Sequence, residues 1–302
     1  MAWNRLAFTS KEEVKRSISD LASIYFSGSK GELEILGTAF PIANTGTQLL
    51  MLTAFHVVEY GYKLSNPRGK ELITSVLDYL PGEDNQRYLN ISNWLEGSRQ
   101  LKCAIYEQDN TYHCDILGAC IRPPLDMSLL VVDISKVDVD LPIFRINTDI
   151  LDIGEEVVIT SFKTKNNSRE LVARHGFITE RLSKGRLVNA PIYRTNIPVE
   201  AGASGGPVFR HDGILYGDKE VVGVITNDFS SEESFLNNNV DGESYISIMA
   251  SASPLGVKNA DGKDFTFKDL CENNVIKDSG SYIKRVQLKF HEDGNWEQKF
   301  PK

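Results

Sequence analysis

The stretch Glu200-Ala201-Gly202-Ala203-Ser204-Gly205-Gly206-Pro207-Val208-Phe209 places one serine among three glycines. Glycine adopts backbone conformations with positive φ that a side chain disfavours, so this segment can turn tightly and bring its N–H groups close to a bound molecule. A hydroxyl in such a turn is typical of a nucleophile that attacks a carbonyl group. We therefore expect Ser204 to be reactive, with the N–H groups of Gly202 and Ser204 forming an oxyanion hole.

A serine hydroxyl needs a histidine as base and a carboxylate that orients the histidine. His56 follows the apolar run 49–52, which predicts a buried strand that ends just before it. Asp126 follows two prolines and precedes the apolar run 129–132, so a turn places its carboxylate at the entrance of a strand. These positions predict that His56 and Asp126 are the partners of Ser204.

Two alternatives remain open in the sequence. Asp115 and Asp133 lie near Asp126, although no strand is expected directly after Asp115, and Asp133 comes after the apolar run rather than before it. Residues 202–206 also satisfy the Gly-x-Ser-x-Gly elbow of α/β-hydrolases, but that motif requires a helix after the serine and the chain order serine, acid, histidine. The segment that begins Gly205-Gly206-Pro207 opens a helix poorly, so we prefer the first interpretation.

Three blocks of the chain, Thr53-Ala54-Phe55-His56, Asp126-Met127-Ser128-Leu129-Leu130 and Gly202-Ala203-Ser204-Gly205-Gly206-Pro207, resemble the signature blocks of chymotrypsin-like serine proteases in their order. Residues 37–42 resemble the strand before the histidine in bacterial members, and residues 221–226 resemble the strand that borders the substrate cleft. The resemblance covers about residues 20–252. It implies an all-β fold of two six-stranded antiparallel β-barrels, and a serine endopeptidase that acts on protein or peptide substrates.

The resemblance also implies a division of the chain into four parts. We expect an N-terminal helical segment over 1–29, a first barrel over 30–140 with His56 and Asp126, a second barrel over 141–252 with Ser204, and a C-terminal extension over 253–302. Helical spacing from Val14 to Tyr25, after a capping box at Ser10–Glu13, predicts the first helix. We expect a polar surface insertion over 65–99 and a loop over 230–243 near the rim of the cleft. Apolar runs bounded by turns predict short strands over 34–42, 49–53, 103–106, 129–134, 156–160, 176–179, 192–196, 208–209, 221–226 and 245–249, and the extension is expected to hold a helix over 265–273 and a strand over 282–291.

Specificity residues follow from the resemblance alone. The position six residues before the nucleophile lines the base of the primary specificity pocket in the family, and here it is Pro198. Without an acid at that position, a preference for Arg or Lys is not expected, and an apolar or small residue before the cut is favoured. Thr226 and Asp228 are expected to border the substrate, with Asp228 and Glu200 adding negative charge near the cleft.

Ala203 stands where digestive members of the family have an aspartate that pairs with a newly cut N-terminus. We therefore expect the serine turn to be organised by its own packing, or by an activating partner or ligand. An alternative function is a latent or vestigial protease-fold module that binds or senses rather than cleaves.

Composition excludes several other classes of protein. The 302 residues are 41% hydrophobic and 25% charged with a net charge of −8, which is typical of a globular domain and argues against a nucleic-acid partner. No apolar stretch reaches the roughly 18 residues of a membrane span, and the apolar run at the N-terminus is too short for a signal peptide, so we expect no membrane association and a cytoplasmic location. The four cysteines match no common zinc spacing and are expected to be free thiols, and neither metal nor cofactor is expected.

Overall fold

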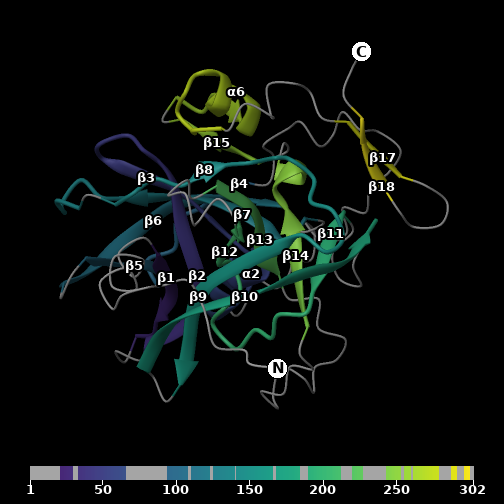
Figure 1. Cartoon of the computed structure of the whole chain (residues 1–302). Helices are drawn as coiled ribbons and strands as arrows, with labels where there is room; N and C mark the ends of the chain where they lie inside the picture. Colours follow the sequence, from purple (N-terminus) through teal and green to yellow (C-terminus); the bar gives the residue numbers. More distant parts are fainter. Residues whose placement is uncertain are drawn as a thin grey trace.

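The first of two closed barrels forms the N-terminal half of the computed structural model (Figure 1). Six antiparallel strands follow one another around it: β1 (Ala22–Ser27), β2 (Leu33–Asn44), β3 (Gln48–Thr53), β7 (Met127–Asp133), β6 (Asn110–Arg122) and β5 (Leu101–Glu107), which pairs again with β1. The short strand β4 (Trp94–Glu96) adds to β6, and the helix α2 (Phe55–Ser65) follows β3. The structure describes residues 21–29, 33–65, 94–107, 110–122, 125–139, 141–165, 168–183, 190–211, 220–226, 243–252, 255–259, 261–278, 287–290 and 296–299.

The second barrel also closes with six antiparallel strands. Their order is β9 (Glu156–Lys165), β10 (Ser168–Leu182), β11 (Ile192–Thr195), β14 (Ser244–Ile248), β13 (Glu220–Thr226) and β12 (Pro207–Arg210), which pairs again with β9. The strand β8 (Arg145–Ile146) adds to β13 in parallel. The predicted pair of six-stranded antiparallel barrels is thus confirmed.

Side chains on β3 show why its sequence is apolar without interruption. Leu49 and Met51 belong to a cluster with residues from all six strands of the first barrel, whereas Leu50 and Leu52 belong to a cluster shared with the second barrel. Successive side chains of a strand point to opposite faces, and in this strand both faces are buried. The alternation therefore fills the barrel interior with one set of residues and the contact between barrels with the other.

Aromatic rings join the two barrels. Phe144, in the segment that connects them, packs edge-on against Phe40 of β2 at a ring-centre distance of 5.8 Å, and its ring lies tilted against Phe209 of β12 at 5.4 Å. All three side chains are buried. Edge-to-face aromatic pairs of this kind stabilise beyond the burial of their area.

The helix predicted near the N-terminus is wrong over its last residues, 22–25, which form a strand instead. Ala22 and Tyr25, which continue the helical spacing in the sequence, lie in β1, where they pair with β2 on one side and β5 on the other. Pairing on both sides satisfies the backbone of this segment and buries Ala22 and Ile24 in the first barrel, so tertiary contacts override the local periodicity. The rest of the expected helix, over 10–20, lies outside the described residues, as do residues 66–93 of the expected insertion and residues 227–242.

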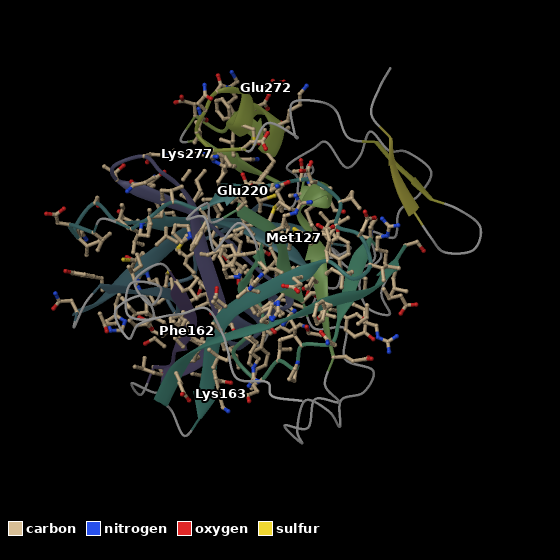
Figure 2. All side chains as sticks on the ribbon, viewed as in Figure 1. Met127, Phe162, Lys163, Glu220, Glu272 and Lys277 are labelled. Atoms are coloured by element: carbon tan, nitrogen blue, oxygen red, sulfur yellow. The ribbon has the colours of Figure 1, made fainter. Side chains whose placement is uncertain are left out.

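The C-terminal extension docks on both barrels. Phe267 and Leu270 of its helix are buried in the cluster between the barrels, and Ile146 of β8 donates a backbone hydrogen bond to Lys277 at 2.8 Å. Figure 2 shows Glu272 and Lys277 at one end of the molecule and Lys163 at the other. The second barrel ends with η3 (Met249–Ala252), and the described elements of the extension are β15 (Gly256–Lys258), β16 (Asp264–Thr266), α6 (Phe267–Glu272), β17 (Gln287–Phe290) and β18 (Trp296–Lys299).

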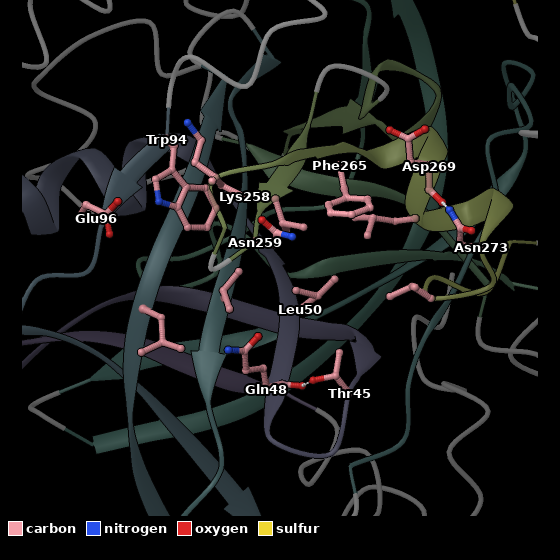
Figure 3. A pocket seen from close by; sticks show the side chains of 16 residues that line it. Thr45, Gln48, Leu50, Trp94, Glu96, Lys258, Asn259, Phe265, Asp269 and Asn273 are labelled. Carbon is pink, nitrogen blue, oxygen red and sulfur yellow. Dashed lines mark hydrogen bonds between the residues drawn. The ribbon is translucent and has the colours of Figure 1, made fainter.

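The helix α6 begins two residues later than predicted, because residues 264–266 pair with β15 instead. Its first turn is closed by a capping box in which Thr266 and Asp269 bond each other's backbone N–H groups. Between this extension and the first barrel lies a pocket of about 820 Å³, lined on opposite sides by Leu50 and Phe265, with Trp94 at one side (Figure 3). Its lining contains none of His56, Asp126 and Ser204.

All four cysteines are buried and free, as predicted. Burial raises the pKa of Cys103, and it raises that of Cys114 to about 11, so these thiols stay protonated at neutral pH. No helix among the described residues combines the length and apolar character that crossing a bilayer demands.

The aromatic contact between the barrels leads to a prediction about stability. Phe144→Ala removes a buried ring that two other rings pack against, so the free energy of unfolding should fall by about 3–5 kcal/mol. Phe177→Ala is the matched control, because Phe177 is 36% exposed on β10 and its loss should cost much less. Urea unfolding followed by circular dichroism measures both. Equal losses in the two variants would show that Phe144 does not hold the barrels together.

Candidate active site

His56 lies where a strand gives way to a helix. β3 ends at Thr53 and α2 begins at Phe55, so His56 is the second residue of the helix. Its neighbours Phe55 and Val57 are buried, whereas 30% of the His56 side chain is exposed. The buried neighbours therefore fix the backbone while the imidazole stays accessible at the edge of the first barrel.

The carboxylate of Asp126 contacts His56 twice. Oδ2 lies 2.8 Å from Nδ1 of the imidazole, and Oδ1 accepts a hydrogen bond from the backbone N–H of His56 at 2.9 Å. The hydroxyl of Thr226, on β13 of the second barrel, also donates to Oδ2. Because Asp126 is only 4% exposed, these three donors replace the water that a carboxylate would otherwise bind.

The backbone at Asp126 is as constrained as its side chain. Its φ of 47° lies in the left-handed region, which aspartate tolerates better than most residues with a side chain. The carbonyl of the preceding Leu125 accepts a hydrogen bond from Ser247 Oγ of β14 at 2.6 Å. Strands of the second barrel thus hold this loop of the first barrel on two sides.

The two alternative acids have other contacts. Asp115 lies inside β6, where its carboxylate pairs with Lys102 on β5, so a strand that the sequence did not predict contains it. Asp133 ends β7 and accepts a hydrogen bond from the backbone N–H of Ser135 at 2.9 Å. Of the three aspartates, Asp126 is the one whose carboxylate contacts His56 in the structure.

The ionisation of His56 reflects two opposing effects. Burial disfavours the charged imidazolium, but the charge of Asp126 and its hydrogen bond outweigh burial and raise the pKa of His56 above its usual value of 6.5. Since the carboxylate accepts at Nδ1, the neutral ring carries its proton there and presents the lone pair of Nε2 on its other side.

The serine lies in two successive tight turns. Ala203 N–H donates to Glu200 C=O at 3.0 Å with Gly202 at φ 90°, and Gly206 N–H donates to Ala203 C=O at 3.0 Å with Gly205 at φ 87°. A bond across four residues with positive φ at the third is the pattern of a type II turn, which explains both glycines. Ser204 is the second residue of the later turn.

Backbone donors of this turn divide into two groups. The N–H groups of Ala203, Gly205 and Gly206 donate to backbone carbonyls, with Gly205 bonding Ile225 at 2.9 Å. Within the described residues, the N–H groups of Gly202 and Ser204 have no hydrogen-bond acceptor. These are the two donors that the sequence predicts for an oxyanion hole.

Thr38 of β2 connects the serine turn to the first barrel. Its hydroxyl donates to the carbonyl of Gly202 at 2.7 Å and accepts from the N–H of Phe162 at 3.1 Å. Its own N–H donates to the carbonyl of Ser204 at 2.8 Å, and its carbonyl accepts from the hydroxyl of Thr53 at 2.7 Å. Thr38 is fully buried, so all four of its hydrogen bonds are shielded from water.

The turn also approaches the strand before the histidine very closely. A Cβ atom on Gly205 would come within 2.2 Å of the carbonyl oxygen of Thr38 and 2.3 Å of Thr53 Oγ1. Backbone atoms cannot move aside for such an atom, so only glycine fits. In this structure Ser204 Oγ and His56 are not hydrogen-bonded to each other, and the two segments meet through the main chain instead.

The predicted specificity residues have different outcomes. Pro198 is half-buried and lines a small hollow together with Glu200 and Ala203. The side chain of Thr226 is buried and its hydroxyl donates to Asp126, and its expected place beside a substrate stays a prediction. Asp228 lies outside the described residues.

Glu200 adds little net charge to the cleft, contrary to expectation. Its carboxylate pairs with Lys163 of β9 at 2.8 Å and with Arg174 of β10 at 2.9 Å, and these two cations balance it. The sequence reasoning missed Lys163 and Arg174, as well as Thr38 and Ser247, because each acts on a residue far away in the chain. A threonine within the block 37–42 was the available signal for Thr38.

The chain is similar to one family of peptidase domains and to several solved structures. A sequence model of the trypsin-like peptidase domain matches residues 37–217, which is more than half of the chain. A search of curated protein sequences finds no significant match. Among solved structures, the active form of the Rv3671c protease from M. tuberculosis is 15% identical, with a TM-score of 0.46 and coverage of 78% of both chains. The HtrA-type protease AlgW with a decapeptide is 14% identical, with a TM-score of 0.48 and coverage of 78% of this chain and 62% of AlgW.

The contact between His56 and Asp126 predicts a titration. Asp126→Asn removes the charge that raises the pKa of His56 and leaves burial, so the pKa should fall below that of the unchanged protein. The stability that the charged pair contributes should be present below pH about 6.5 and should be lost as the pH rises through the folded pKa. NMR titration of the imidazole, assigned with a His56→Gln variant, measures the shift. The same pKa in both proteins would contradict the proposed cause.

Proposed function

The chain belongs to the family of trypsin-like peptidase domains, and from this we propose that it is a serine endopeptidase that uses Ser204, His56 and Asp126. The observation that carries the proposal is the carboxylate of Asp126, 2.8 Å from His56 Nδ1 and held by residues of both barrels. A carboxylate in this place fixes the imidazole tautomer in which Nε2 is free to take a proton, which is what a serine nucleophile needs.

The proposed reaction assigns a role to each of these groups at each step. His56 Nε2 takes the proton of Ser204 as Oγ attacks the carbonyl of a peptide bond, and Asp126 stabilises the imidazolium that forms. The N–H groups of Gly202 and Ser204 bind the oxyanion of the tetrahedral intermediate. One such donor is worth roughly 10²–10³ in rate. His56 then protonates the leaving amine, and water, deprotonated by His56, hydrolyses the acyl-enzyme.

For specificity, we propose an apolar or small residue before the cleaved bond. The resemblance places Pro198 at the base of the primary pocket, and Pro198 carries no charge that would select Arg or Lys. Glu200 is the acid nearest to it in the sequence, and its charge is balanced by Lys163 and Arg174. A basic substrate residue would therefore gain little from this part of the site.

A latent binding or sensing module is the second candidate. It is favoured by one observation: Ser204 Oγ and His56 are not hydrogen-bonded to each other in the structure. In the endopeptidase proposal this bond forms when substrate binds, as catalytic hydrogen bonds are often long in free enzymes. In the latent alternative it waits for an activating partner or does not form at all.

Labelling with a fluorophosphonate probe separates the two candidates. The probe phosphonylates a serine oxygen that an adjacent base activates, so the unchanged protein should be labelled, and Ser204→Ala and His56→Ala should not. Labelling is read by in-gel fluorescence, with folding of each variant checked by circular dichroism. A folded, unchanged protein that resists the probe would favour the latent module, and labelling of Ser204→Ala would place the nucleophile elsewhere.

The hydroxyl of Thr38 provides a test of the serine turn. Thr38→Val keeps the shape but leaves the Gly202 carbonyl and the Phe162 N–H without a partner, at a cost of roughly 1–3 kcal/mol. If the turn loosens by that amount, the second-order rate of probe labelling should fall about tenfold or more.

Thr38→Ser is the matched control, because it loses a methyl group but keeps the hydroxyl, and its labelling rate should stay close to that of the unchanged protein. A similar loss of rate in both variants would indicate that packing of the methyl group, rather than the hydrogen bonds, positions the turn.

A further inference from the structure

Three potential metal ligands converge on the second barrel, away from the proposed catalytic residues. Glu156 begins β9, His175 lies in β10, and His211 directly follows β12. β9 pairs with β10 on one side and with β12 on the other, so the three side chains come from adjacent strands (Figure 1). The register supports this, since Val157 of β9 lies opposite both Gly176 and Arg210.

The ligand atoms are close enough to share one ion. Glu156 Oε2 lies 3.1 Å from His175 Nε2 and 3.0 Å from His211 Nδ1, and all three atoms lie within 4.8 Å of one another. Zn²⁺ binds histidine nitrogen and carboxylate oxygen at about 2.0–2.2 Å, so two ligands of a tetrahedral ion are separated by about 3.4 Å. Small side-chain rotations would therefore open room for an ion at the centre.

The two imidazoles lie side by side and are reachable from solvent. The centres of the His175 and His211 rings are 4.4 Å apart. Arg210, the residue before His211 in the chain, faces Glu155 at 3.6 Å and Asp149 at 3.8 Å. About a third of each histidine side chain is exposed, which leaves an ion access from solvent.

We propose that Glu156, His175 and His211 bind a zinc-like divalent cation, with water completing the coordination. Two imidazoles and one carboxylate form a donor set that zinc and its neighbours in the first transition row favour, whereas Mg²⁺ prefers oxygen donors alone. The ion would link β9, β10 and the end of β12, and thereby stabilise one end of the second barrel. The proposal is independent of peptidase activity.

Calorimetric titration of the full chain tests the site. After removal of bound metal with a chelator, Zn²⁺ should bind saturably with one ion per chain, and Mg²⁺ should not. His175→Gln and His211→Gln each remove one ligand, and each should weaken binding by more than the roughly 10–100-fold that the loss of an outer-shell partner costs. Zn²⁺ should also raise the Tm of the unchanged protein, because an ion that binds only the folded state stabilises it.

His113→Gln is the matched control. His113 is an exposed histidine of the first barrel that bonds Tyr25, so its loss should leave zinc binding unchanged. Absence of saturable zinc binding would overturn the proposal, and so would binding that survives both His175→Gln and His211→Gln. Because the two variants act on different strands, a folding defect in one leaves the other as the test, and Glu156→Gln provides a third.

Discussion

The contact between the serine turn and the first barrel determines where the proposed catalytic groups lie. At Gly205 the two main chains come so close that a Cβ atom would overlap the carbonyl oxygen of Thr38, 2.2 Å away. Thr38 bonds the turn through both its hydroxyl and its N–H. Buried hydrogen bonds of this kind are strong in a low dielectric and costly to leave incomplete. The position of Ser204 relative to the strand that leads to His56 is therefore set by backbone atoms, which have far less freedom than long side chains.

The position of Asp126 is also fixed by contacts between the two barrels. Its backbone occupies the left-handed region, and such strain costs about 1–3 kcal/mol and persists only where surrounding contacts determine the conformation. Those contacts are identifiable: Thr226 bonds its carboxylate and Ser247 bonds the carbonyl before it. Both residues belong to the second barrel. The aromatic contacts of Phe144 stabilise the packing of the two barrels against each other. The hydrogen bonds of Thr226 and Ser247 fix one relative position of the barrels.

Charged and titratable side chains of the second barrel form two separate clusters, one around Glu200 and one around Glu156. Next to the serine turn, Lys163 and Arg174 pair with Glu200, which offsets the negative charge of its carboxylate. Further along the same strands, Glu156 and His175 face His211 and form the proposed cation site. Arg174 and His175 are neighbours in β10, and because successive side chains of a strand point to opposite faces, one strand serves both places. An ion bound at the proposed cation site would stabilise β12, the strand that follows the serine turn.

Local patterns in the sequence predicted much of the architecture. Apolar runs such as 49–52 and 221–226 mark strands buried on both faces, and glycine chemistry marks the turn around Ser204. The contact between His56 and Asp126 agrees with the prediction, whereas their catalytic roles and the oxyanion hole stay predictions. Continuous apolar runs do not mark β6, because polar residues alternate with apolar ones along its first half, a pattern that also indicates a strand. A short segment such as β1 fits the helical and the strand period equally well, so its spacing predicts a helix. Thr38, Ser247 and the partners of Glu200 were not predictable, nor was the contact of Thr226 with Asp126, since each bonds a residue distant in the chain.

The period of side chains and the freedom of glycine are properties of a few adjacent residues, and the sequence by itself determined them. The hydrogen-bond partners were decided only when two closed barrels packed together, because closure sets which distant backbones lie side by side.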